Sequence, residues 1–256
     1  MTTIVAERTY RNVATNSDVV ARLFAPECVD ESEWHCRVEI HGLERPVDSR
    51  IIGIDSFQAL CLGLQFLCKL LAGEEAGLAF LDGQPGDSDI PLIASCSFPQ
   101  TRIEALRFIK QKDSELLDAL PGPVSSVQPE DVSETKMTNV VAERVLRDTT
   151  TDAPVVARMS APRCAGPISW YCDIEVRGLG SPFEQAINGT DSFKALYLGL
   201  FKICKHLEEH EHHLAAPADG APAGDANLPF ISFCPPAAKP EAHRYLMDKL
   251  MAEYRP

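Results

Sequence analysis

The chain contains two diverged copies of one sequence. A shift of 136 residues, without a gap, aligns Val5-Ala6-Glu7-Arg8 with Val141-Ala142-Glu143-Arg144 and Asp55-Ser56-Phe57 with Asp191-Ser192-Phe193. About half of the positions between 5 and 71 are identical to their counterparts, which chance does not produce. The two copies must therefore share one fold, and a function of the domain should be visible in both.

The repeat also sets the domain boundaries. Met137-Thr138-Asn139 restarts the pattern that begins at Met1-Thr2-Thr3, and a two-residue insertion later aligns Gly86-Asp87 with Gly224-Asp225. The segment 120–136 is rich in proline, serine and acidic residues, as exposed linkers are. We expect a first domain over residues 1–119, a linker over 120–136 and a second domain over 137–256.

Several segments of the first copy have the pattern of strands. Thr3–Arg11 and Asp18–Phe24 are rich in valine and aromatic residues, and a turn-like stretch separates them. From Trp34 to His41 apolar and polar residues alternate, which predicts an antiparallel strand with one buried face. Further short strands are expected at Arg50–Ile54, Leu78–Leu81 and Ile90–Ser95.

A long amphipathic helix should follow the first strands. Phe57, Leu60, Leu64, Leu67 and Leu71 belong to an apolar stripe with helical spacing. Asp55 or Ser56 can cap its start, and Gly73 can end it in a left-handed conformation.

Glycine also occurs in the middle of this helix in both copies, at Gly63 and Gly199, although it costs about 1 kcal/mol against alanine there. We therefore expect the helix backbone to pack closely on the sheet. A last helix is expected from near Thr101, with its counterpart near Pro240. The predicted fold class is α+β: two tandem homologous domains, each an antiparallel β-sheet packed by one long helix and a C-terminal helix.

Net charge and cysteines narrow the functional classes. The net charge of −13 argues against a nucleic-acid partner, which needs a cationic face. Residues 1–136 carry −10 of this charge and residues 137–256 carry −3.

No signal peptide is recognised, and the longest apolar stretch, Phe57–Ala72, is expected to be too short and polar for a membrane span. The nine cysteines form no CxxC pair, so we expect buried reduced thiols and a cytoplasmic protein.

No catalytic, cofactor or metal site is predicted. His206 and His210 have the i, i+4 spacing of metal ligands on a helix, but the first copy has Leu70 and Glu74 in their places. Among the polar residues shared by both copies, Glu7, Arg8, Arg22 and Glu39 are expected to form cross-strand ion pairs on the solvated face. Asp55 is assigned to helix capping. An enzyme with an unfamiliar site between the domains stays open as an alternative, and it predicts a deep pocket.

Acidic residues near an aromatic side chain mark the candidate binding surface. Asp30, Glu31 and Glu33 precede Trp34, which we expect to be exposed, and Glu74 and Glu75 follow the long helix. Asp87 and Asp89 lie in a predicted turn. Acidic loops of this kind suit a basic protein partner, because complementary charge steers its approach.

The shared pattern resembles a known family. Val-Ala-Glu-Arg, then Trp-x-Cys-x-(Val/Ile)-Glu with Gly-Leu, then Gly-x-Asp-Ser-Phe-x-Ala-Leu, is similar to a family of small bacterial domains of unknown function. The resemblance covers nearly all of each copy, implies a bacterial source and carries over no catalytic residue. The small acidic α+β plan is also similar to many immunity proteins of bacterial toxin systems, a likeness of fold and charge alone.

Two functional hypotheses follow. The first is a cytoplasmic, non-catalytic protein-binding module that neutralises a basic toxin by covering its active site. The second is a structural or regulatory protein in which the two repeats pack through equivalent surfaces as a pseudo-dimer. Neither involves a membrane, and the chain itself is expected to be a monomer or weak dimer.

Overall fold

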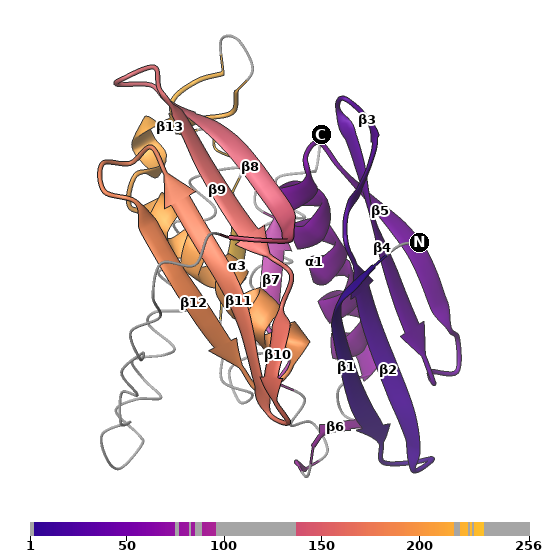
Figure 1. Cartoon of the computed structure of the whole chain (residues 1–256). Coiled ribbons are helices and arrows are strands. Elements are labelled where there is room, and N and C mark those ends of the chain that lie inside the picture. Colours follow the sequence, from indigo (N-terminus) through magenta and orange to yellow (C-terminus); the bar gives the residue numbers. More distant parts are fainter. Residues whose placement is uncertain are drawn as a thin grey trace, which may run out of the picture.

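Each half of the chain folds into one antiparallel sheet and one long helix (Figure 1). The computed structural model describes residues 3–74, 77–81, 83–84, 89–95, 137–217, 221–224, 226 and 228–232. The predicted α+β class and its repetition in two similar halves are confirmed. The linker 120–136 and the last helices expected near Thr101 and Pro240 lie outside the described residues.

The first sheet has six strands in the order β3-β4-β2-β1-β6, with β5 on the other edge of β4. The strands are β1 (Ile4–Asn12), β2 (Ser17–Phe24), β3 (Glu27–Asp30), β4 (Glu33–His41), β5 (Val47–Gly53) and β6 (Leu78–Phe80). The strands expected from the alternating pattern are present. β3 was not predicted, because all four of its residues are exposed and it has no alternation.

The second sheet repeats this plan. Its strands are β8 (Val140–Asp148), β9 (Pro154–Ser160), β10 (Arg163–Gly166), β11 (Ser169–Arg177), β12 (Phe183–Gly189) and β13 (Leu214–Ala215), in the matching order. Even a strand irregularity recurs, between Ile4 and Ala6 in β1 and between Val140 and Ala142 in β8. The sequence repeat is thus a structural repeat down to the register of its strands.

Helices α1 (Ser56–Glu74) and α3 (Ser192–Glu208) bury the predicted apolar stripe. The expected end of α1 was wrong: Gly73 lies inside the helix, and its backbone is not left-handed. By length and composition alone, α1 is sufficient to cross a membrane, contrary to the sequence expectation. More than half of that span is buried against the protein's own strands, and core packing accounts for its apolar character.

Each helix packs on its own sheet and also contacts the other half. α1 lies on β4 and β5 and contacts β8, while α3 lies on β11 and β12 and contacts β1. Figure 1 shows α1 between the two sheets. As a result, the buried apolar side chains of both halves form one continuous core.

A short ribbon shows the symmetry of this arrangement. β7 (Leu92–Ser95) of the first half pairs antiparallel with β14 (Pro229–Ser232) of the second. At its centre Ile93 pairs with Ile231, which is its own counterpart in the repeat. The two halves are therefore related by an approximate two-fold axis, as the subunits of a homodimer would be.

The cysteines differ in exposure. Cys36, Cys61, Cys68, Cys172 and Cys204 are buried, as expected, but Cys28 and Cys164 are exposed. The expectation that the matched cysteines all lie in cores was wrong for this last pair, because β3 and β10 lie at the sheet ends, beyond the reach of the helices. Cys96 and Cys234 lie outside the described residues.

Thiol labelling should separate these groups. Burial raises the pKa of the Cys36 thiol to about 12, and burial also raises the pKa of Cys61 and Cys172. The thiolate is the reactive form, so a maleimide or disulfide reagent at pH 8 should modify Cys28 and Cys164 in the native protein. Peptide mapping should find Cys36 and Cys172 unmodified until the chain is unfolded. Fast native labelling of Cys36 would contradict the described packing.

The close approach of helix and sheet is confirmed at both mid-helix glycines. A Cβ at Gly63 would lie 2.8 Å from Cys36 Sγ and 3.1 Å from Leu23 Cδ1. A Cβ at Gly199 would lie 3.1 Å from Met159 Sδ and 3.2 Å from Cys172 Sγ. Glycine is kept in these helices because no side chain fits between helix and sheet.

A matched pair of glycine substitutions tests this packing. Gly63→Ala should lower the free energy of unfolding by about 1–3 kcal/mol, since overpacking outweighs the gain in helix propensity. Gly73→Ala, in the same helix but with no atom near its Cβ position, should be neutral or stabilising by up to about 1 kcal/mol. Urea unfolding of both variants measures the difference, and equal effects would show that Gly63 has no packing role.

Candidate functional site

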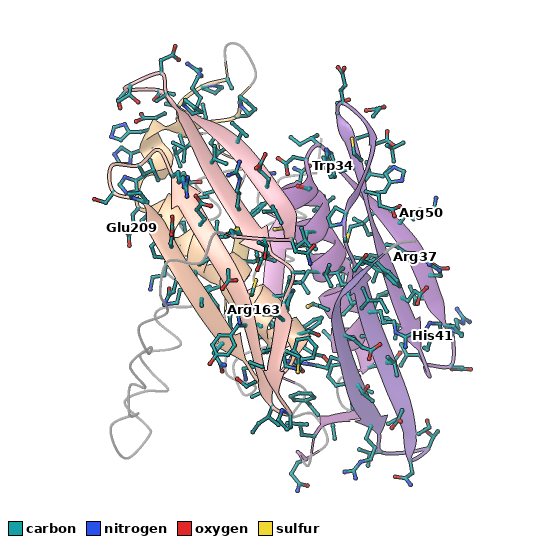
Figure 2. All side chains as sticks on the ribbon, in the orientation of Figure 1. Trp34, Arg37, His41, Arg50, Arg163 and Glu209 are labelled. Atoms are coloured by element: carbon teal, nitrogen blue, oxygen red, sulfur yellow. The ribbon has the colours of Figure 1, made fainter. Side chains whose placement is uncertain are left out.

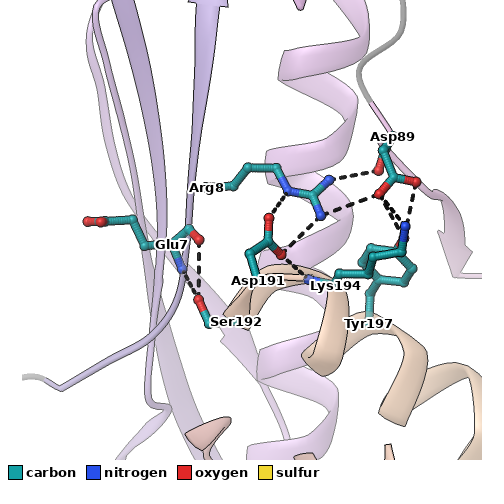
Figure 3. A network of polar contacts seen from close by, with 7 residues as sticks. All are labelled: Glu7, Arg8, Asp89, Asp191, Ser192, Lys194 and Tyr197. Atoms are coloured by element: carbon teal, nitrogen blue, oxygen red, sulfur yellow. Dashed lines mark hydrogen bonds and ion pairs between the residues drawn. The ribbon is translucent and has the colours of Figure 1, made fainter. Parts of the chain in front are cut away.

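The most highly connected polar cluster joins the two halves through a buried arginine. The Arg8 side chain has no exposed surface, and it donates to Asp191 twice, from Nε (2.7 Å) and from Nη2 (3.0 Å). Its Nη1 donates to the Asp89 carbonyl oxygen at 2.9 Å (Figure 3). Its guanidinium also stacks over the Phe80 ring at 4.1 Å. Such a two-pronged, buried contact fixes both distance and orientation between the halves.

The same contact recurs at the other end of the interface. Arg144 of β8 donates to Asp55 from Nε (2.9 Å) and Nη2 (3.3 Å), and it lies over the Phe57 ring at 5.3 Å. Asp55 and Asp191 each sit immediately before a helix and also accept from a first-turn amide, of Gln58 and Lys194 respectively. The capping role predicted for Asp55 is confirmed, and pairing with the opposite half is a second role.

Helix-start serines complete the contact. Ser192 Oγ accepts from the Glu7 amide at 2.9 Å and donates to the Glu7 carbonyl at 3.2 Å. Ser56 makes the same two bonds with the Glu143 backbone, at 2.8 and 3.2 Å. Each helix start is thus bonded to the first strand of the other half, and the Asp-Ser-Phe motif shared by both copies is an interface motif.

The expectation that Arg8 lies on the solvated face was wrong. Neighbouring strand residues point to opposite faces, so Arg8 shares the inward face of Ala6 and Tyr10, while Glu7 points outward. That alternation was readable in the sequence. The identity of the buried partner was not, because Asp191 is 183 residues away.

The Glu7–Arg22 pair does lie on the exposed outer face, but the expectation of a solvated position was wrong for Glu39, which is only 8% exposed because neighbouring side chains such as Arg37, 2.6 Å away, cover it. Arg22 pairs with Glu7 at 2.6 Å and with Glu39 at 3.9 Å, and Arg158 pairs with Glu143 in the second half. Figure 2 shows Arg37, His41 and Arg50 along this face of the first sheet. Exposed pairs of this kind add little stability.

The groups around Arg8 keep its guanidinium positively charged, and they do not form the environment of an activated nucleophile. Burial alone lowers the pKa of the guanidinium, but Tyr10, Asp191 and Asp89 outweigh that effect and raise it. Lys194 Nζ donates to the Asp89 carboxylate at 2.9 Å, and the Tyr197 hydroxyl donates to it at 3.4 Å. Burial and the nearby Asp89 charge raise the pKa of Tyr197, so its hydroxyl stays protonated. These groups donate hydrogen bonds to and accept them from one another, and such contacts hold the two halves together.

A groove of about 340 Å³ opens at the start of α1. Its first-half wall includes Ala25, Pro26 and Trp34, and its second-half wall is the strand segment Asn139–Glu143. Trp34 is half-buried rather than exposed, and Figure 2 shows it beside the first turns of α1. The groove exists only because the two halves are paired.

The predicted acidic residues separate into three places. Asp30, Glu31 and Glu33 lie together in the β3–β4 hairpin beside the groove. Glu74 is exposed at the far end of α1, roughly 27 Å away along a helix of 19 residues. Asp89 belongs to the Arg8 cluster, and Glu75 and Asp87 lie outside the described residues.

The hairpin has one acidic residue that the prediction missed. Glu27 on β3 is exposed and pairs in register with His35, next to the acidic tip. The corresponding hairpin of the second half contains Arg163 and no acidic residue from 163 to 169. The acidic hairpin therefore occurs once in the chain. Its counterpart, which contains β10, lies at the lower end of the molecule in Figure 1, and β3 lies at the upper end.

The histidine cluster is not organised as a metal site. The Phe183 ring stacks on His206 at 4.3 Å, and the His206 and His210 rings are 5.8 Å apart. Burial and the neighbouring His210 lower the pKa of His206. Within the described ranges, no group of three or more histidine, cysteine or acidic side chains is placed to hold a metal ion.

Comparison with known proteins places the chain in one family. The model of the domain of unknown function DUF6968 matches residues 6–92 and again residues 142–219. The chain belongs to this family and contains its domain twice, as the sequence resemblance implied. Searches of curated proteins and of solved structures found no significant match.

Removing Arg8 should be far more damaging than removing an outer arginine. Arg8→Ala leaves the Asp191 carboxylate without its partner in the interface, so we expect a loss of about 3–5 kcal/mol in the free energy of unfolding. Arg22→Ala, which removes an arginine from the exposed pair with Glu7, should lose less than about 1 kcal/mol. Chemical denaturation measures both, and a small effect at Arg8 would refute its role as the link between halves.

Proposed function

We propose that this protein is a non-catalytic protein-binding module that engages a basic partner through the acidic β3–β4 hairpin and the adjoining Trp34 groove. The observation that carries the proposal is their juxtaposition. Four acidic residues, Glu27, Asp30, Glu31 and Glu33, lie in the same hairpin as Trp34, which lines the groove together with Pro26. An aromatic wall with a charged rim is the usual composition of a protein-binding hot spot.

Charge supports a partner of opposite sign. No lysine or arginine occurs between Arg22 and Arg37, and the His35 ring, whose Nε2 lies 2.5 Å from Glu33, is the titratable base in this segment, so the hairpin carries an excess of negative charge. The net charge of −13 adds a long-range field that speeds the approach of a basic protein. The hairpin of the second half lacks these charges, which favours one binding face per chain.

The polar residues that both copies share support binding over catalysis. Arg8, Asp55 and Ser56 and their counterparts are used to hold the halves together, and Glu7 and Arg22 pair on the outer face. The groove wall is mainly apolar side chains and strand backbone. These shared residues thus have architectural roles, and the β3–β4 hairpin, which differs between the copies, is the proposed binding surface.

The most concrete form of this proposal is neutralisation of a bacterial toxin in the cytoplasm. An acidic hairpin that covers a basic active site would block substrate access without any chemistry of its own. A neighbouring gene that encodes a growth-arresting basic protein, with growth restored by co-expression of this chain, would support that form.

A second candidate is a structural or regulatory protein whose function is the paired state itself. The reciprocal Arg–Asp and Ser–backbone contacts favour it, because the repeats pair through equivalent surfaces. The two candidates differ in one respect: only the first needs the acidic hairpin.

Charge reversal with a matched control distinguishes them. Glu27→Lys with Glu31→Lys reverses two hairpin charges and spares Asp30, whose carboxylate accepts from Ser32 and shapes the turn. Asp18→Lys with Glu44→Lys makes the same change in net charge at exposed positions near the opposite end of the sheet.

Tagged full-length chains expressed at native level in the host should capture a stoichiometric basic partner, released at high salt. The hairpin variant should bind it roughly tenfold or more weakly, because close opposite charges at an interface contribute this much. The control variant should bind it as the wild type does. A partner retained by the hairpin variant, or clean monomer without a partner, would reject the proposal and leave the second candidate.

A further inference from the structure

The two ends of the interface share their Arg–Asp pair but differ in what surrounds it. At the Arg8 end, the Asp89 carboxylate accepts from Lys194 Nζ at 2.9 Å, lies 3.5 Å from Arg8 Nη2 and receives the Tyr197 hydroxyl at 3.4 Å (Figure 3). In the repeat alignment, Asp89, Lys194 and Tyr197 correspond to Asn227, Gln58 and Cys61. The charged cluster is therefore present at one end of the interface, and its counterpart residues are uncharged.

This difference has a consequence for which repeats can pair. If two first repeats paired in the same way, Arg8 would still meet an aspartate, Asp55, but Asp89 would face Gln58 and Cys61, which carry no positive charge. If two second repeats paired, Lys194 would face Asn227. Both like pairs keep the common contacts. A pair of first repeats leaves Asp89 with Arg8 of its own repeat but without the ammonium group, and a pair of second repeats leaves Lys194 without its carboxylate, and each loss is unfavourable.

The pairing of unlike repeats satisfies each of these groups. Asp89 gains an ammonium group and a hydroxyl donor, and in the sequence the counterparts of all three residues, Asn227, Gln58 and Cys61, are uncharged. The side chains of Asp89 and Lys194 are about one-third exposed, so solvent weakens their attraction without abolishing it. Selectivity then comes as much from the unpaired charge in the like pairs as from the bond in the unlike pair.

We propose that Asp89, Lys194 and Tyr197 form a pairing-specificity cluster, through which the first repeat selects the second repeat over another copy of itself. The duplicated domain has become an obligate unlike pair. This inference does not depend on the acidic hairpin or on any external partner.

Cleaving the folded chain between the repeats tests this selection. A protease site placed within 120–136 lets the two halves exchange partners, and native mass spectrometry counts like and unlike pairs after equilibration at low concentration. We expect unlike pairs in roughly tenfold excess over the statistical mixture, as a difference of one charged contact implies.

Asp89→Asn with Lys194→Gln should bring the mixture close to the statistical ratio. Both substitutions use the residue that the chain already has at the equivalent position, so folding should survive. Asp48→Asn with Arg37→Gln is the matched control, because it removes an ion pair of 2.8 Å on the outer face and should leave the selection unchanged.

The uncut chain gives a second readout that needs no reassembly. In a double-mutant cycle of melting temperatures, Asp89→Asn and Lys194→Gln should each lower the midpoint, and the second substitution should do little once the first is made. Additive losses, a statistical mixture for the wild type, or an unchanged preference in the Asp89→Asn, Lys194→Gln variant would each overturn the proposal.

Discussion

The structure depends on a buried charge whose closest counterion lies in the other half. Arg8 points into the interior of the first repeat, where it has no exposed side-chain surface, and the carboxylate closest to it belongs to the second repeat. Arg144 repeats the situation in the other direction with Asp55. A buried guanidinium that loses its bidentate carboxylate is strongly unfavourable, so each repeat reaches its most favourable electrostatic state only when the other is docked. Pairing of the halves is in this sense part of folding.

The apolar core is likewise completed only when the two halves are paired. Helix α1 covers β4 and β5 of its own sheet and contacts β8 of the other, and α3 does the same for β1. A single small domain buries a limited fraction of its surface, and sharing the helices between two sheets creates one larger core. The ribbon centred on Ile93 and Ile231 then joins the halves by backbone pairing. Packing, charge and backbone bonds all act across the same two-fold axis.

Two groups of the positions that diverged after duplication bear on what the pair does. The residues that hold the halves together, such as Arg8 and Ser56, are unchanged in the other copy. Two groups that differ are Asp89 with its neighbours inside the interface and the acidic residues of the β3–β4 hairpin outside it. The first group bears on which repeats pair, and the second on what the pair presents to other molecules. An ancestral two-fold assembly can become asymmetric through such changes without altering its fold.

The amino-acid sequence alone determined the repeat, the α+β class, the principal strands and helices, and the burial of Cys36 and of the helix stripe, because these rest on local periodicity of two and of about 3.6 residues. The same periodicity already required Arg8 to point away from the face of Glu7. Only the tertiary structure decided that Asp191 and Asp89 accept hydrogen bonds from Arg8. It also decided that Trp34 borders a groove built by both halves, and that Glu74 lies far from the hairpin. Those contacts join residues that are far apart in the chain, and no local pattern encodes which of several carboxylates a folded chain brings to a buried arginine.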